Sequence, residues 1–422
     1  MNFFSPFKVT VLSSLLGAAL AHGEDSLPTP GNHEAPPVFE ASKVLPAEWL
    51  SGPHHRVREL APSDGYLVNF TIDSDFGTFE CAGTREVKRR IYEIQAIARL
   101  VQFSKGDVFA AGVKQSIEAP IEAVKNIADK PVDSLEQVPH TVGHFFSQIR
   151  STVGSAVRNA GKKKPAVSGS TQPKRKQGLI RSVAGIAGFD KAKLTVAHQL
   201  GVDPYSDNER LQEEMEKVTW ALFAGGLPLD IGVKVASSGA SFALSATEFV
   251  GLPDEIYEIT PSELALRDRR ALEAMGIDIP TIDAVIGNES LPPSMRHHMI
   301  GSIQQLGNTQ GRENLVLLLT VCQDSRHSHF LKNVFDLMVR RHQVQRYIDF
   351  GVYGHLPAAS TPQGVVEVCA PVDYVSWTDQ VAAFAQRSDW GDIPRRLVLE
   401  GLLSSRAEAE IEAIGWEIVS VE

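Results

Sequence analysis

The phrase Val113-Lys-Gln-Ser returns at a constant step of 11 residues, as Val124-Lys-Asn-Ile, Leu135-Glu-Gln-Val, Phe146-Ser-Gln-Ile and Val157-Arg-Asn-Ala. In each copy an apolar residue is followed two places later by a side-chain amide. Eleven residues make three helical turns at about 3.67 residues per turn, so the repeat keeps one face of a helix aligned. A proline inside a helix costs about 3 kcal/mol, and the stretch contains Pro120, Pro131 and Pro139. We therefore predict several short amphipathic helices rather than one rod.

The repeat has two interpretations. Ordinary amphipathicity explains its apolar positions, but not the side-chain amides that recur in register with them. The pattern resembles the 11-residue repeats of lipid-surface proteins such as apolipoproteins and synucleins, which implies contact with a membrane surface. Packing of the apolar stripe against the rest of the protein is the alternative, and it accounts for the same spacing.

A basic stretch without acidic residues follows the repeat. No Asp or Glu occurs between Glu136 and Asp190, and residues 161–178 combine Gly, Ser, Pro and Lys, which predicts a basic flexible linker. Anionic lipid headgroups attract such a run at about 1 kcal/mol per basic side chain, although a solvated linker has the same composition. The candidate membrane- or anion-binding side chains are Lys162, Lys163, Lys164, Lys174, Arg175 and Lys176.

The N-terminal residues indicate export. Residues 1–21 have a charged start at Lys8, an apolar run over Val9–Leu20 and a small-residue cleavage site at Ala19-Leu20-Ala21, as in a secretory signal peptide. Residues 22–64 are rich in Pro and His and lack apolar periodicity, so we predict a tether without regular structure. The expected location is periplasmic or secreted, with peripheral attachment to a membrane as one form of it.

Composition limits the classes of function. The chain has 422 residues, 43% of them hydrophobic, which suffices for packed cores. A formal net charge of −10 argues against bulk nucleic-acid binding. The only cysteines are Cys81, Cys322 and Cys369, so this is not a disulfide scaffold. Either Cys322 and Cys369 form one bridge, or all three are buried thiols.

Residues 65–160 are predicted to hold a β-hairpin and amphipathic helices. Tyr66–Cys81 alternates apolar and polar residues on either side of a turn at Asp73-Ser74-Asp75. Thr84–Ser104 has apolar residues at spacings of three and four, which predicts a helix with Thr84 as N-cap. The basic run Lys88-Arg89-Arg90 is expected on its solvated side. The repeat helices complete this segment.

Residues 179–290 are predicted to form a helical domain. Ser206-Asp-Asn-Glu209 matches a capping box. Asp203, Asp207 and Glu209 form a loose carboxylate cluster, for which helix capping is a simpler explanation than calcium. Val218–Val250 is the most apolar region after the signal peptide. It carries a ridge of small residues and is predicted to be a buried helical hairpin.

Residues 291–422 are predicted to form a C-terminal α/β domain. Helices are expected at Pro293–Leu306 and Arg312–Cys322, with a third capped by Ser328. Strand and helix signals then alternate in β-α-β-α-β order, which predicts a small, partly parallel layer. The whole chain is therefore assigned to the α+β class, predominantly helical. It has an N-terminal β-hairpin with amphipathic helices, a helical middle region and a small C-terminal α/β unit.

Recognised catalytic motifs are missing from the sequence: it has no phosphate-binding loop, dinucleotide fingerprint, nucleophile elbow or zinc-protease helix. The densest candidate for a metal site is Asp324, His327 and His329, whose alternative explanation is a helix cap at the surface. His297-His298 is a weaker candidate. Asp373 follows a predicted strand in the α/β unit, where open-sheet sites form, although an N-cap role explains it more simply.

These observations favour an exported envelope protein that acts by binding rather than by catalysis. The partner would be an anionic membrane surface or another envelope protein, with no specific nucleic acid expected. A hydrolase with its site in residues 291–422 is the alternative, in its metal-assisted form through Asp324, His327 and His329. The sequence indicates no particular cofactor.

Overall fold

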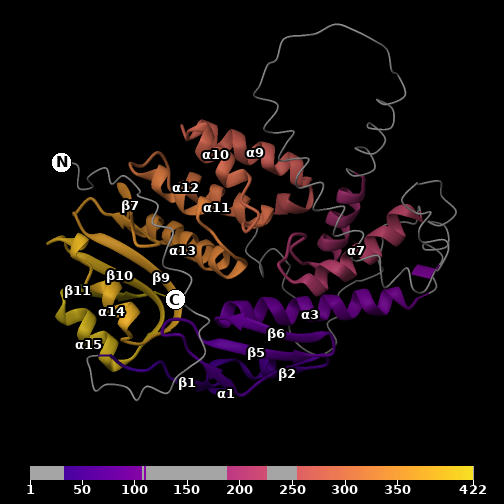
Figure 1. Cartoon of the computed structure of the whole chain (residues 1–422), viewed down its shortest axis with the longest axis horizontal. Coiled ribbons are helices and arrows are strands. Elements are labelled where there is room, and N and C mark those ends of the chain that lie inside the picture. The colour runs from indigo at the N-terminus through magenta and orange to yellow at the C-terminus, as the bar shows by residue number, and fades with distance from the viewer. Residues whose placement is uncertain (1–32, 107–108, 111–187, 226–253, 422) are drawn as a thin grey trace, which may run out of the picture.

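A computed structural model of the chain describes residues 33–106, 109–110, 188–225 and 254–421 (Figure 1). The predicted signal peptide, the 11-residue repeat, the basic linker 161–178 and most of the apolar region Val218–Val250 lie outside these residues. The described parts form a mixed α+β structure with strands near the N-terminus, helices in the middle and a C-terminal sheet unit, which confirms the predicted fold class.

The N-terminal part is a small antiparallel sheet with one long helix packed on it. A four-stranded sheet has the order β2-β3-β5-β6, and β1 pairs with β4 beside it. Phe70 and Ile72 of the sheet pack against Val87 and Ile91 of α3 in one buried cluster. The elements are β1 Val38–Glu40, α1 Ala41–Val44, α2 Ala47–Leu50, β2 Ser51–Gly52, β3 His55–Val57, β4 Leu60–Pro62, β5 Asn69–Ser74, β6 Gly77–Ala82 and α3 Thr84–Ser104.

The predicted hairpin is confirmed as β5 and β6, which pair from Asn69 opposite Ala82 to Ser74 opposite Gly77. The reversal lies two residues later than predicted, at Asp75 and Phe76. Gly77, with φ +126°, begins the return strand in a backbone conformation that other residues rarely adopt. The predicted helix Thr84–Ser104 is confirmed as α3, although its N-cap is Gly83 rather than Thr84.

The prediction of an unstructured tether is wrong for residues 38–62, which form β1 to β4 and two short helices. Ala41, Leu45, Val57 and Ala61 are buried in the cluster beneath α3. The prolines do not prevent this structure, because they occupy positions that tolerate a missing N–H. Pro46, for example, is the N-cap of α2, and Pro62 is the last residue of β4.

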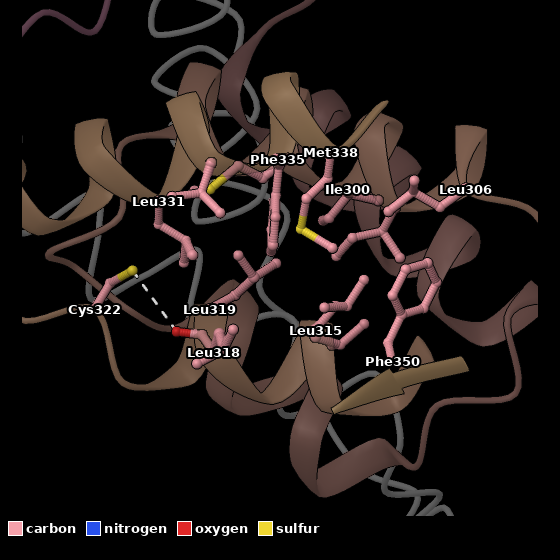
Figure 2. Close-up of a cluster of buried hydrophobic side chains, with 14 of the residues drawn as sticks. Ile300, Leu306, Leu315, Leu318, Leu319, Cys322, Leu331, Phe335, Met338 and Phe350 are labelled. Atoms are coloured by element: carbon pink, nitrogen blue, oxygen red, sulfur yellow. Dashed lines mark hydrogen bonds between the residues drawn. The ribbon is translucent and has the colours of Figure 1, made fainter. Parts of the chain in front are cut away.

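A helical bundle forms the middle of the molecule (Figure 1). Figure 2 shows its core, where side chains from α11, α12, α13 and β7 meet and Cys322 Sγ lies 3.7 Å from the Leu318 carbonyl oxygen. Leu272 of α9 and Ile282 of α10 belong to the same core. The bundle helices are α9 Pro261–Ala274, α10 Ile279–Ile286, α11 Pro293–Gln305, α12 Arg312–Thr320 and α13 Ser325–Val344.

The C-terminal part is a five-stranded sheet in the order β11-β10-β9-β8-β7. Strands β9, β10 and β11 are parallel, as the predicted β-α-β-α-β order requires, whereas β7 and β8 form an antiparallel hairpin that the sequence analysis missed. Cys369 and Val398 face the core beneath α13, and Val368 and Leu399 face α14 and α15. The elements are β7 Asp349–Tyr353, β8 Leu356–Ser360, β9 Val366–Val375, α14 Asp379–Ala385, η3 Ser388–Trp390, β10 Arg395–Leu403, α15 Ser405–Ala413 and β11 Trp416–Ser420.

The three cysteines are free and buried, so the structure contains no Cys322–Cys369 bridge. Burial raises the pKa of the Cys322 and Cys369 thiols to about 12 and raises the pKa of Cys81 further. The cysteines therefore act as small core residues, as one of the two interpretations predicted.

Polar contacts join the N-terminal and C-terminal sheets. The Asp373 carboxylate accepts hydrogen bonds from Val68 N at 3.0 Å, Thr84 N at 3.2 Å and Thr84 Oγ1 at 2.9 Å. Glu400 of β10 pairs with Arg85 of α3 and with Arg340 of α13. Asp373 thus lies inside β9 and satisfies the first turn of α3. The predicted N-cap role at the following helix belongs to Thr378, which caps α14.

Candidate functional site

Three of the four points where the described chain stops lie in one buried apolar cluster, which we call the anchor cluster, and the fourth, at residue 188, packs on the end of α7 beside it. It joins α3, the helix over residues 188–200, α7 (Glu209–Ala224) and η2 (Asp254–Tyr257). Its members are Tyr92, Ala96, Ile97, Leu100, Phe109, Val196, Ala197, Leu200, Val202, Leu211, Met215, Val218, Ala221, Leu222, Ile256 and Tyr257. The described residues that flank segments 111–187 and 226–253 therefore lie in or beside this cluster.

Aromatic contacts are made at three of the four ends. Phe109 packs edge-on against Phe103 of α3, with ring centroids 6.4 Å apart. Phe189 lies 6.0 Å from Phe223 and 5.5 Å from Trp220, so the start of the 188–200 helix touches the end of α7. The approach is close, because a Cβ at Gly188 would lie 2.9 Å from the Phe223 ring.

The remaining end, at the start of η2, is held by a ring contact and by hydrogen bonds to a histidine. Tyr257 of η2 lies 5.0 Å from His198, measured between ring centroids. His297 of α11 bridges Asp268 at 2.6 Å and Glu255 of η2 at 3.0 Å. An imidazole donates to two carboxylates only when it is protonated. Burial lowers the pKa of His297, but the bonds to Asp268 and Glu255 outweigh burial and raise it overall.

A network of buried charges lies between α3, the loop before α7 and α13. Arg89 Nη1 donates to Asp207 at 2.6 Å and Arg89 Nη2 to Glu86 at 2.9 Å. Arg90 Nη1 donates to Glu93 at 2.8 Å. We call these five residues, Glu86, Arg89, Arg90, Glu93 and Asp207, the charge network.

Hydrogen-bonding residues complete the network on the α7 side. Ser206 Oγ donates to Glu93 Oε1 at 2.6 Å, and Asn208 Nδ2 donates to Glu93 Oε2 at 2.9 Å. The Asn208 side chain also accepts from Leu211 N, which makes Asn208 the N-cap of α7. The predicted capping box starting at Ser206 is therefore wrong, because Ser206 is used by Glu93 of α3.

The prediction that Lys88-Arg89-Arg90 lies on a solvated side is wrong for both arginines. Arg89 is 8% exposed and Arg90 6% exposed, since α3 packs against the sheet on one side and against the 188–208 region on the other. Only their spacing from Glu86 and Glu93, three or four residues apart on one helix, signals pairing in the sequence. Their further partner Asp207 lies more than 100 residues away, so no local pattern reveals the burial.

The network sets the charge states of its members. Burial alone would raise the pKa of Asp207, but the Arg89 and Arg90 guanidiniums hold it well below its usual range. Burial and the positive charge of Arg89 lower the pKa of His329 well below its ordinary value, although Asp207 lies 3.8 Å away. His329 is therefore a neutral imidazole beside ionised pairs. Every charge in the network has a partner, so the network has a structural role: it holds α3, the loop before α7 and α13 together.

The predicted metal site at Asp324, His327 and His329 does not form. Asp324 is the N-cap of α13 and accepts from His327 N at 2.7 Å, so Ser328 is not the cap. His327 and His329 are two positions apart on a helix and therefore face different directions. Within the described residues no three His, Cys, Asp or Glu side chains gather closely enough to hold a metal ion. The metal-assisted form of the hydrolase interpretation thereby loses its ligands.

The predicted carboxylate cluster is also dispersed. Asp203 accepts from Ser294 Oγ at 2.6 Å and from Tyr205 N at 2.8 Å, and burial raises its pKa to about 6. Asp207 belongs to the charge network, and Glu209 is an exposed first-turn residue of α7. Asp203 therefore stabilises a loop, Asp207 belongs to the buried core, and Glu209 lies at a helix terminus.

The candidate anion-binding residues Lys162, Lys163, Lys164, Lys174, Arg175 and Lys176 lie outside the described residues. No helix within the described ranges combines the length and the apolar character that crossing a bilayer requires. Comparison with known proteins adds no assignment: no protein-family model, no curated protein and no solved structure matches the chain.

Proposed function

We propose that the protein acts by binding an anionic membrane surface, and that the anchor cluster is the platform from which its membrane-binding segments are presented. One observation carries the proposal: the described residues that flank segments 111–187 and 226–253 lie in or beside the same buried cluster. The first segment carries the amphipathic repeat and the basic run, and the second is mainly apolar. Both segments are therefore attached to the described structure at neighbouring points.

The distribution of charge supports an oriented approach. Residues 137–189 contain nine Lys and Arg and no Asp or Glu. Because the whole chain has a formal net charge of −10 and this stretch contributes +9, the rest carries −19. An anionic surface attracts the basic stretch and repels the remainder, which favours contact through one side.

The aromatic side chains at the chain ends suit the same role. Trp220 and Phe223 are only partly buried, beside the points where residues 187 and 226 join the described structure. Amphipathic aromatic rings are enriched where proteins meet the headgroup region of a bilayer. They would contribute apolar area close to the basic stretch.

Export belongs to the same proposal, since the signal-peptide pattern places the protein outside the cytoplasm. Cleavage after Ala21 gives a mature protein that begins at His22. Intact-mass measurement of the exported protein should show this terminus, and a terminus at Met1 would contradict it.

Vesicle co-sedimentation tests the binding proposal. The mature protein should sediment with vesicles containing anionic lipid and much less with neutral vesicles. Added salt should weaken binding, because the Debye length falls to about 3 Å at 1 M. Replacing Lys162, Lys163 and Lys164 by Ser should reduce binding roughly 100-fold, at about 1 kcal/mol per charge. The matched control replaces three exposed basic residues elsewhere, namely Arg270, Arg346 and Arg406.

The two variants show whether vesicle binding depends on the basic stretch in particular or on positive charge in general. Lost binding in the lysine variant and retained binding in the control support a membrane role for the basic stretch. Equal loss in both variants, or no sedimentation of the parent protein at low salt, contradicts it.

A further inference from the structure

A small cavity with a mixed polar and apolar lining lies at the end of the C-terminal sheet, away from the anchor cluster. Its volume is about 60 Å³, and its polar lining comes from Gln310, Asp349, Ser360 and Thr361. Asp349 is the first residue of β7 and Ser360 the last of β8, and the two are paired directly across the hairpin. Opposite residues of an antiparallel pair project to the same side of a sheet, so both side chains share the face that the cavity adjoins.

Two of the lining groups lack the partners that buried polar groups normally have. The hydroxyl of Ser360, a residue 4% exposed, has no hydrogen-bond partner among the described residues. Asp349 is 7% exposed, and within the described ranges its carboxylate has the Phe350 backbone N–H as a hydrogen-bonding neighbour but no ion pair with a basic side chain. Buried carboxylates are normally paired with a cation or coordinate a metal.

The backbone holds this carboxylate in place. Gly311 has φ +72°, and a Cβ there would lie 2.0 Å from the Phe350 carbonyl oxygen and 2.8 Å from Asp349 Oδ1. The Gln310 carbonyl accepts from Phe350 N at 2.9 Å, which fixes the preceding loop to the edge of β7. The loop and the hairpin therefore present Gln310 and Asp349 to the cavity from a fixed backbone.

We propose that this cavity binds a small hard metal cation, with Asp349 as the charged ligand and the Ser360 hydroxyl and the side-chain oxygens of Gln310 and Thr361 as neutral ligands. Carboxylate, hydroxyl and amide oxygens are the donors preferred by Ca²⁺, Mg²⁺ and similar ions. The volume accommodates an ion together with a few waters, since one water needs about 10–15 Å³ of such space. The bound ion would join the loop before α12 to the β7–β8 hairpin.

Thermal unfolding of the full mature chain tests the proposal, first in chelator and then with Ca²⁺, Mg²⁺ or Na⁺ added separately at constant ionic strength. At 100 times the dissociation constant, one of these ions should raise Tm by roughly 3 °C. Asp349→Asn should show no such rise. In chelator this variant should match or exceed the parent Tm, because it removes an uncompensated buried charge. Ser360→Ala keeps the charge and should need about ten times more ion for the same rise, as expected for one lost ligand.

The control Glu412→Gln removes one negative charge from an exposed position on α15 and should respond like the parent protein. If Asp349→Asn does not fold, the Ser360→Ala titration decides alone. The proposal is overturned if no ion raises the parent Tm, if Asp349→Asn responds as strongly as the parent, or if methylammonium reproduces the effect of the metal ions. A cavity filled only with water gives the first of these results.

Discussion

Asp207 shows how a single buried carboxylate holds distant parts of the chain together. It accepts from Arg89 and Arg90 of α3 and lies beside His329 of α13. Without Asp207, Arg89 and Arg90 would keep Glu86 and Glu93 as partners but lose their shared acceptor from the loop before α7, and breaking a buried ion pair from one side costs about 3–5 kcal/mol. The charge network is therefore expected to control whether α3, the loop before α7 and α13 stay packed.

Replacing Asp207 by Asn should lower the free energy of unfolding by about 3 kcal/mol, because it breaks the buried ion pairs that join Arg89 and Arg90 of α3 to the loop before α7. Because the folded pKa of Asp207 lies below its unfolded value, its contribution is present above the unfolded pKa and is lost as pH falls below about 4. Urea unfolding at pH 7 and pH 3.5 measures both effects. The exposed Asp392→Asn variant is the control, with an expected change below about 0.5 kcal/mol. Equal stability of the two variants at pH 7 would contradict the assigned role.

At the scale of elements, the junction between the two sheets depends on the side chain of Asp373. This carboxylate, from the C-terminal end of β9, accepts hydrogen bonds from Thr84 at the start of α3 and from Val68 just before β5. It replaces the N-terminal cap that Gly83 cannot supply from its own side chain. One residue therefore fixes both the beginning of α3 and its position against the C-terminal sheet.

Replacing Asp373 by Ala should cost about 2 kcal/mol, the sum of a lost helix cap and a lost buried hydrogen bond. Replacing Asp373 by Asn keeps one acceptor oxygen and should therefore cost less stability than replacing it by Ala. Chemical denaturation gives the loss of stability, and amide hydrogen exchange should show faster opening at Thr84 and Val68 but not at α15. Unchanged protection at both amides in Asp373→Ala would show that the cap does not hold the junction.

The sequence predicted elements with strong local signals to within one or two residues. The predicted helices Thr84–Ser104, Pro293–Leu306 and Arg312–Cys322 correspond to α3, α11 and α12, because apolar spacing is a strong local signal. The hairpin β7–β8 was missed because Gly351 and Pro357 lie inside its strands and weaken the strand pattern.

The candidate sites were harder to predict because their partners are distant along the chain. Arg89 and Asp207 are 118 residues apart, and Asp373 and Thr84 are 289 apart. Local reasoning therefore assigned Arg89 to solvent and Asp373 to the next helix. Tertiary packing decides both cases, since a buried charge is favourable only with its partner in place.

At the scale of the whole molecule, the anchor cluster and the C-terminal sheet lie at opposite ends. Figure 1 shows α7 and the end of α3 on one side, and α14 and α15 of the C-terminal sheet on the other. The anchor cluster belongs to the first side, and the proposed cation cavity belongs to the C-terminal sheet. If the anchor cluster presents the membrane-binding segments, the two ends of the molecule must behave differently at a vesicle surface.

The most direct measurement attaches an environment-sensitive fluorophore to one end or the other. Gln102→Cys places it on the last turn of α3, next to the anchor cluster, and Ser405→Cys places it on the first turn of α15; both positions are exposed and uncharged. The native thiols will not compete, because all three are buried and their pKa values are raised.

With anionic vesicles that contain a spin-labelled lipid, emission from the probe at position 102 should shift to the blue and be quenched. Emission from the probe at position 405 should stay unchanged, and both effects should disappear at 1 M salt. Equal quenching at the two positions, or stronger quenching at 405, would contradict the claim that the anchor cluster is the membrane-facing end.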